Sequence, residues 1–164
     1  MNRLMTAAAC AAMAMLAGAA LAHSEAKHDK KEARALSADE HAFGREGDPK
    51  KASRTVRIDM SDRMRFSPDR LSIRQGETVK FIVRNSGKTM HELVIGSMKE
   101  LKAHAELMRK HPGMEHEEPY MAHVAPGKAG TLVWQFTKAG EFHFGCLIPG
   151  HFEAGMFGTI VVNP

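Results

Sequence analysis

The chain has 164 residues and a formal net charge of +4 at pH 7, from 23 Lys or Arg residues and 19 Asp or Glu residues. The basic residues are scattered among acidic ones, which argues against a nucleic-acid-binding arm or recognition helix, so we expect no nucleic-acid partner. The length is sufficient for one domain with a hydrophobic core and too short for two.

The first residues indicate export. Asn2-Arg3 gives a short positive start, residues 4–21 are apolar, and Ala20-Leu21-Ala22 has the small-x-small pattern of a signal-peptide cleavage site. We expect residues 1–22 to be a signal peptide that is cleaved after Ala22. Because the apolar segment is short and rich in alanine, we expect no membrane anchor and a periplasmic location.

Signal cleavage also changes the cysteine content. Cys10 lies within the predicted signal peptide, which leaves Cys146 as the one thiol of the exported protein. An intrachain disulfide is then impossible. A single thiol in an oxidising compartment is a reactive liability unless something occupies it, and a metal ion is the simplest occupant.

The remaining sequence predicts a polar tail followed by one β-rich domain. Residues 23–53 are charged and nearly free of large apolar side chains, so we expect a flexible, histidine-containing tail. Short segments with polar–apolar alternation or turn signals at their ends predict strands at 55–60, 66–73, 78–83, 90–95, 121–124, 130–136, 141–145 and 158–162. Ser97 is the predicted cap of one helix that ends at Lys110. These elements predict an all-β fold over residues 54–164, an antiparallel Greek-key β-sandwich with one inserted helix.

The most specific pattern lies near the C-terminus. Cys146, His151 and Met156 are separated by two intervals of four residues, and His91 lies in an apolar segment upstream. A thiolate, two imidazoles and a weak axial thioether are the ligands of a mononuclear electron-transfer copper site. Taken singly, His91 and Met156 would more often be core residues, but together with the lone thiol they favour copper.

Two other uses of the thiol fit the sequence less well. Structural zinc favours several thiolates or paired CxxC spacing, which this sequence does not have. A cysteine nucleophile would have His151 nearby, but no acidic orienting residue or oxyanion arrangement can be named.

The segment Gly145-Cys-Leu-Ile-Pro-Gly-His-Phe-Glu-Ala-Gly-Met156 resembles the copper loop of the cupredoxins, and His91 matches their upstream ligand. The resemblance covers residues 54–164, and the whole chain is most similar to the periplasmic cupredoxins linked to bacterial copper tolerance (CopI type). It implies a cupredoxin-like Greek-key β-sandwich with one type 1 copper. The implied copper ligands are His91, Cys146, His151 and Met156. The resemblance also implies single-electron transfer and a role in copper tolerance.

Two positions depart from better-known relatives. Multicopper oxidases carry histidines on both sides of the loop cysteine, whereas this chain has Gly145 and Leu147 there. It therefore lacks ligands for an oxygen-reducing cluster, and we expect no enzyme activity. Glu92 follows His91 where many small cupredoxins have an asparagine that ties the site together. Whether Glu92 hydrogen-bonds in the same way or faces solvent is left open.

The residues around His151 also suggest how the protein meets a partner. Apolar side chains surround this ligand in the sequence, at Leu147, Ile148, Pro149, Phe152, Met156 and Phe157. An apolar ring around a partly exposed ligand would let a redox protein approach the metal closely. We expect a transient redox partner that docks near His151, and a monomeric protein.

Further histidines and methionines suggest an alternative function. The candidates for additional, weaker copper sites are His23, His111, Met114, His116, Met121 and His123. The competing interpretation is a solvated polar loop and tail. His104 and His143 have no evident cluster partners and are predicted to be structural. If the additional sites matter most, the protein would sequester or deliver copper, and redox cycling would be incidental.

Overall fold

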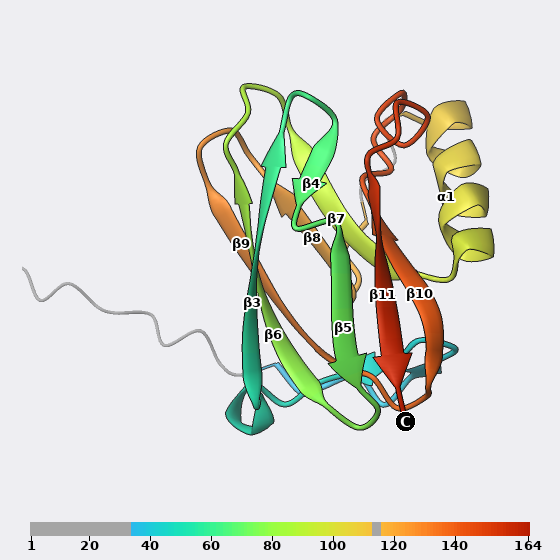
Figure 1. Cartoon of the computed structure of the whole chain (residues 1–164). Coiled ribbons are helices and arrows are strands. Elements are labelled where there is room, and N and C mark those ends of the chain that lie inside the picture. The colour runs from blue at the N-terminus through green and yellow to red at the C-terminus, as the bar shows by residue number, and fades with distance from the viewer. Residues whose placement is uncertain (1–33, 113–115) are drawn as a thin grey trace, which may run out of the picture. The chain divides into compact units, whose positions relative to one another are not determined.

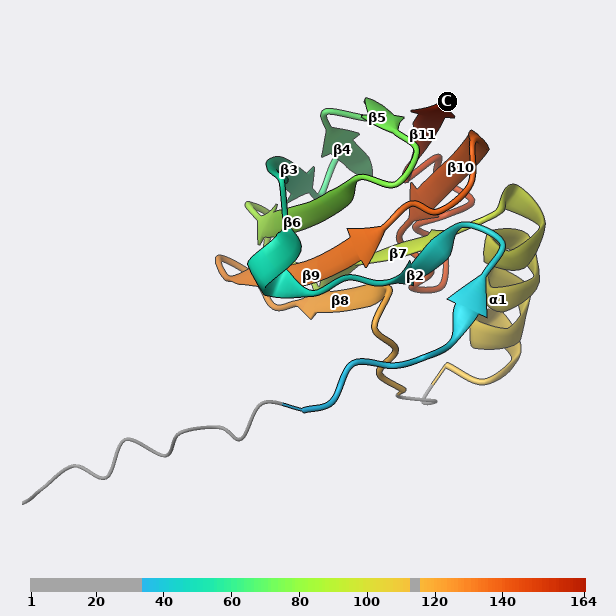
Figure 2. The same cartoon turned by 90° about the horizontal axis from the view of Figure 1, so that it is seen from below.

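The computed structural model describes residues 34–112 and 116–164, which form two β-sheets packed face to face with one α-helix (Figures 1 and 2). The predicted signal peptide and residues 23–33 of the predicted tail lie outside the described residues. Within the described part of the chain, no helix is long and apolar enough to cross a membrane.

The first sheet has six strands in the order β1-β2-β9-β6-β3-β4. Their bounds are β1 Glu40–His41, β2 Gly44–Glu46, β9 Ala129–Gln135, β6 Thr78–Asn85, β3 Arg54–Ser61 and β4 Arg65–Ser67, and a short 3-10 helix, η1, spans Pro49–Lys51. Along β3, the side chains of Val56, Ile58 and Met60 are buried and alternate with more exposed neighbours. This is the pattern of a strand with one face toward the core, as the sequence predicts.

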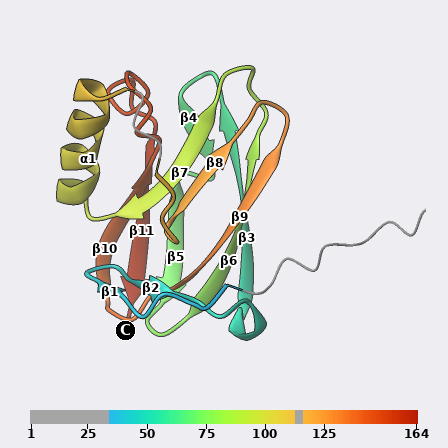
Figure 3. The same ribbon diagram turned by 180° about the vertical axis from the view of Figure 1, so that it is seen from behind.

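The second sheet has five strands in the order β5-β11-β10-β7-β8. Their bounds are β5 Arg70–Arg74, β11 Phe157–Asn163, β10 Gly140–Gly145, β7 His91–Gly96 and β8 Met121–Val124. Every residue of β7 is buried, so this strand lacks the alternation of its neighbours. The reason is that α1 (Met98–Lys110) lies against β7 and β10 and covers the outer face there (Figure 3).

The helix begins and ends as predicted. The Ser97 hydroxyl oxygen accepts a hydrogen bond from the Glu100 backbone N–H, and the Glu100 side chain accepts one from the Ser97 backbone N–H. This reciprocal capping box satisfies backbone donors that a helix start leaves unpaired. Leu101, Ala105 and Met108 are the buried residues of the helix. The cupredoxin-like β-sandwich with one inserted helix is confirmed.

The prediction of a purely antiparallel sandwich is wrong at two places. β3 pairs with β6 in parallel, and β5 pairs with β11 in parallel. The predicted single strand 66–73 is two strands, because the chain leaves the first sheet after Ser67 and enters the second at Arg70. Segments that change sheets in this way are not joined by hairpins, so their pairing direction could not be inferred from turn signals.

The prediction of a flexible tail up to residue 53 is also wrong for its described part. Residues from Arg34 onward belong to the same compact unit as the sandwich. β2 pairs with β9, and Phe43 is 2% exposed with its ring 5.2 Å from that of Trp134. The Trp134 indole N–H also donates to the Phe43 carbonyl oxygen. The prediction was wrong because the segment is polar on average, whereas a single aromatic side chain, Phe43, is enough to attach it to the core.

Candidate metal centre

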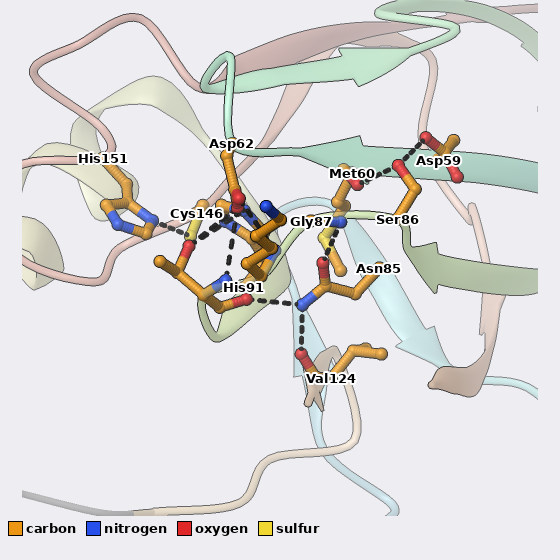
Figure 4. Close-up of polar contacts among 12 residues, drawn as sticks. Asp59, Met60, Asp62, Asn85, Ser86, Gly87, His91, Val124, Cys146 and His151 are labelled. Carbon is orange, nitrogen blue, oxygen red and sulfur yellow. Dashed lines mark hydrogen bonds and ion pairs between the residues drawn. The ribbon is translucent and has the colours of Figure 1, made fainter. Parts of the chain in front are cut away.

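Three of the predicted ligands meet at one end of the sandwich. The ligand atoms of His91, Cys146 and His151 all lie within 4.8 Å of one another. The Cys146 Sγ and His151 Nδ1 are 3.3 Å apart, and the rings of His91 and His151 have centroids 5.0 Å apart. Figure 4 shows the Cys146 and His151 side chains pointing toward each other. Metal–ligand bonds of about 2.0–2.3 Å allow one ion to reach three atoms so arranged.

His91 presents a nitrogen that is suited to a metal. Its Nε2 lies 3.1 Å from an Asp62 carboxylate oxygen, whereas its Nδ1 is buried and has no hydrogen-bond partner among the described residues. A neutral imidazole that donates from Nε2 to the carboxylate keeps its lone pair on Nδ1. A buried polar atom without a partner is rare in proteins, and here a metal ion would satisfy it.

Asp62 orients His91 because it is itself fixed by several donors. Its carboxylate accepts hydrogen bonds from the backbone N–H groups of Lys88 and Thr89 and from the Thr89 hydroxyl. These donors, the Lys88 N–H first, hold the pKa of Asp62 well below its ordinary value. The carboxylate therefore stays ionised and can keep accepting the His91 Nε2–H.

Asn85, at the end of β6, holds the loop that leads to His91. This fully buried side chain donates to the carbonyl oxygens of Thr89 and Val124 and accepts from the Gly87 N–H (Figure 4). The loop is thus tied to β8 before it enters β7. Sequence reasoning did not identify Asp62 or Asn85, because the contacts of Asp62 with the loop before His91 and of Asn85 with Val124 form only in the folded chain.

The loop from Cys146 to Met156 is closed by backbone hydrogen bonds. The Cys146 N–H donates to the Met156 carbonyl oxygen, and the Met156 N–H donates to the His151 carbonyl oxygen, each at 3.0 Å. Met156 is fully buried in the core cluster that contains Cys146. The role of its thioether as the axial ligand stays a prediction.

Glu92 takes the first of the two arrangements that the sequence left open. It is 2% exposed, and one carboxylate oxygen accepts the Leu147 backbone N–H at 2.8 Å. The other oxygen lies 2.8 Å from the His123 Nε2. Glu92 therefore ties β7 to the residue after Cys146.

Burial controls the protonation of the two loop ligands. It raises the pKa of the Cys146 thiol to about 12, because a thiolate is poorly solvated in the core. Burial also lowers the pKa of His151, and the nearby His91 lowers it further. Without a metal, the site at neutral pH therefore holds a protonated thiol and a neutral His151 imidazole.

The apolar residues predicted around His151 divide into two groups. Leu147 and Met156 are fully buried, and Ile148 and Phe152 are partly buried against the core. Pro149 and Phe157, in contrast, are exposed, Phe157 to 41%. His151 itself is partly exposed, so it is the predicted ligand through which solvent and partners can approach.

Among the described residues, the histidines predicted as additional metal ligands form no group of three that could share an ion. His23 and Met114 lie outside the described residues. Among residues 34–112 and 116–164, the one group of three or more His, Cys, Asp or Glu residues close enough to share an ion is His91, Cys146 and His151. Additional copper sites therefore stay a prediction.

The remaining candidates differ in burial, although His116 and His123 line the same groove. His111 is exposed at the end of α1, and Met121 is buried in a small core cluster beneath the helix. The His116 ring lies 4.7 Å from the His104 ring, so His104 has a partner that sequence reasoning missed. Burial and the neighbouring His116 lower the pKa of His104. His123 belongs to the carboxylate contact described above.

Comparison with known proteins is consistent with this geometry. Residues 52–163 match the family of copper-binding proteins described as the plastocyanin/azurin family. The chain is 49% identical to the copper-resistant cuproprotein CopI of Rubrivivax gelatinosus over 99% of both chains. It is 33% identical to the protein of that name from Pseudomonas aeruginosa, over 80% of this chain and 88% of the other.

Solved structures support the fold. Auracyanin B has a TM-score of 0.62 at 20% identity, covering 74% of this chain and 96% of that one. Dithionite-reduced auracyanin from Roseiflexus castenholzii has a TM-score of 0.60 at 20% identity, covering 69% and 99%. At this identity the likeness concerns the fold alone.

Proposed function

Because this chain belongs to the plastocyanin/azurin family of copper-binding proteins, we propose that it is a periplasmic single-electron carrier that acts in copper tolerance. The proposed copper ligands are His91, Cys146, His151 and Met156. The observation that carries the proposal is that one imidazole nitrogen each from His91 and His151 lies close to the buried Cys146 thiol. The three ligand atoms are all within 4.8 Å of one another. Bound copper supplies a one-electron couple, and the residues of the chain determine its geometry and its access.

The rigidity of the site supports electron transfer. His91 and Cys146 are fully buried, and their positions are fixed by Asp62, by Glu92 and by the backbone of the copper loop. Ligands that are held before the metal arrives move little when its charge changes, which keeps the reorganisation energy low. The partly exposed His151 would be the point of electron entry and exit, where a transient redox partner docks.

The setting in copper tolerance rests on the relatives. A protein matched over nearly its whole length at 49% identity is named a copper-resistant cuproprotein. Export is supported by the Ala20-Leu21-Ala22 pattern, which is typical of a signal-peptide cleavage site. A buried thiol that holds copper is protected from the oxidising chemistry of the periplasm.

The electron-transfer role predicts which part of the chain is needed for tolerance. In a copper-stressed host, Cys146→Ser is expected to remove tolerance, whereas deletion of residues 23–33 is expected to preserve it. The deletion ends there because Arg34 contacts Glu46 and β1 follows. Growth against copper concentration is the measurement, and the purified wild-type protein should give a reversible one-electron wave in voltammetry. Loss of tolerance only on the deletion would instead support sequestration by the tail.

The raised pKa of Cys146 predicts proton release when copper binds. Below about pH 12 the free protein carries a thiol, whereas copper binds the thiolate, so each copper should displace one proton at pH 8. The apparent copper affinity should therefore rise about tenfold per pH unit in this range. Calorimetric titrations in buffers of different protonation enthalpy measure the proton count. A count of zero at pH 8 would mean that the thiol is already ionised.

A further inference from the structure

Glu92 connects the strand that carries His91 to the loop that carries Cys146. It directly follows His91 in β7, and its Oε1 accepts the N–H of Leu147, the residue directly after Cys146. Its Oε2 contacts the Nε2 of His123, which is its cross-strand partner in β8. One side chain thereby connects the strand of one ligand, the loop of another and the neighbouring strand.

An ionised carboxyl group can make both contacts. The Leu147 N–H can only donate, and a His123 ring that donates from Nε2 makes the second oxygen an acceptor as well. A carboxyl group that accepts at both oxygens is a carboxylate. A buried carboxylate is costly unless its oxygens are hydrogen-bonded, and the described contacts of Glu92 provide for both.

We propose that Glu92 and His123 form a positioning pair that fixes the Cys146 thiolate, and that the Glu92 charge lowers the reduction potential of the copper. The inference rests on the copper site of the proposed function. Positioning follows from the bond to Leu147, because that amide is one covalent step from Cys146. The charge effect follows from electrostatics. Reduction removes one positive charge from the metal, so a nearby buried negative charge favours the oxidised state.

The pair also reaches the protein surface. His123 is 37% exposed on its side chain, and it lines a groove together with Met90, Met108 and Ile148. A substitution of the solvent-accessible His123 would therefore remove one contact of the buried Glu92 carboxylate. An amide in place of Glu92 would keep the hydrogen bond to Leu147 but would carry no charge.

Two substitutions of Glu92 separate position from charge. Glu92→Ala removes the bond to Leu147, and we expect copper binding to weaken about 10- to 100-fold and the thiolate-to-copper absorption band to shift. Glu92→Gln keeps an acceptor for Leu147, so the band should stay in place while the reduction potential rises. His123→Ala should change the band in the same direction as Glu92→Ala, by a smaller amount.

Glu141→Gln is the matched control. Glu141 is an exposed carboxylate on β10, and its Oε1 lies 3.7 Å from the His143 Nε2. This pair is also a carboxylate–imidazole contact, but it does not touch the proposed copper ligands. Its loss should leave both the band and the potential unchanged. Copper titration, visible spectra and voltammetry are measured together with thermal unfolding of the metal-free proteins.

The outcomes distinguish this inference from the copper site itself. A wild-type protein that forms no coloured copper complex would disprove the site. With a coloured wild type, an unchanged band in Glu92→Ala or an unchanged potential in Glu92→Gln would overturn the pair's role. A lower melting temperature with unchanged spectra and potential would show that Glu92 is merely structural. If Glu92→Ala does not fold, the shape-preserving Glu92→Gln and the His123→Ala variant still decide the question.

Discussion

Replacing Cys146 with serine is expected to abolish the intense visible absorption that the wild-type protein develops with Cu(II). That absorption arises from charge transfer between the thiolate and the metal, and Cys146 is the one cysteine among the described residues. A serine hydroxyl is a hard ligand that does not ionise at neutral pH, so it supplies neither the electronic transition nor the soft donor. The loss should be complete. Visible and paramagnetic resonance spectra during a copper titration measure it.

The control for this substitution lies on β10, the strand that Cys146 directly follows. His143 lies on β10, three residues before Cys146, and its ring contacts Glu141 instead of the ligand cluster. His143→Gln should retain the band and bind one copper at the same site. A coloured complex in Cys146→Ser, or a colourless one in the wild type, would contradict the ligand assignment.

The copper loop was the part of the site most readily predicted from sequence. Cys146, His151 and Met156 are close in the chain, and the short intervals between them limit how the loop can close. His91 was found because a copper site of this kind needs a second imidazole, and His91 lies upstream in an apolar segment. The same argument could not identify Asp62 or Asn85, since neither is a copper ligand and their long-range contacts with His91 and Val124 cannot be inferred from the local sequence.

The strands were predictable where one face is buried and the other is not. β3 and β6 show that alternation, but β7 is buried on both faces and was found as a continuous apolar run. Pairing direction was not predictable, because β4 and β5 belong to different sheets although two residues separate them. Periodicity reports on burial and carries no information about which strands become neighbours.

Replacing Phe43 with alanine is expected to lower the free energy of unfolding by about 3–5 kcal/mol, the usual cost of removing a buried phenylalanine ring. Phe43 is 2% exposed, and its ring packs against Trp134 and Tyr120 at centroid distances of 5.2 and 5.5 Å. The neighbouring Gly44 has a φ of +118°, which lets the chain turn closely onto β9. Denaturant unfolding of the metal-free protein measures the loss.

The same experiment tests whether residues 34–53 are part of the folded domain. Leu36 comes from the same segment but is 46% exposed, so Leu36→Ala should change the free energy of unfolding by no more than about 0.5 kcal/mol. β1 and β2 lie at the end of the sandwich opposite the copper loop (Figures 1 and 3). Folded Phe43→Ala should therefore keep the visible copper band despite its lower stability. If Phe43→Ala is as stable as Leu36→Ala, the segment is a tail, as its composition suggested, and Phe43 does not attach it to the core.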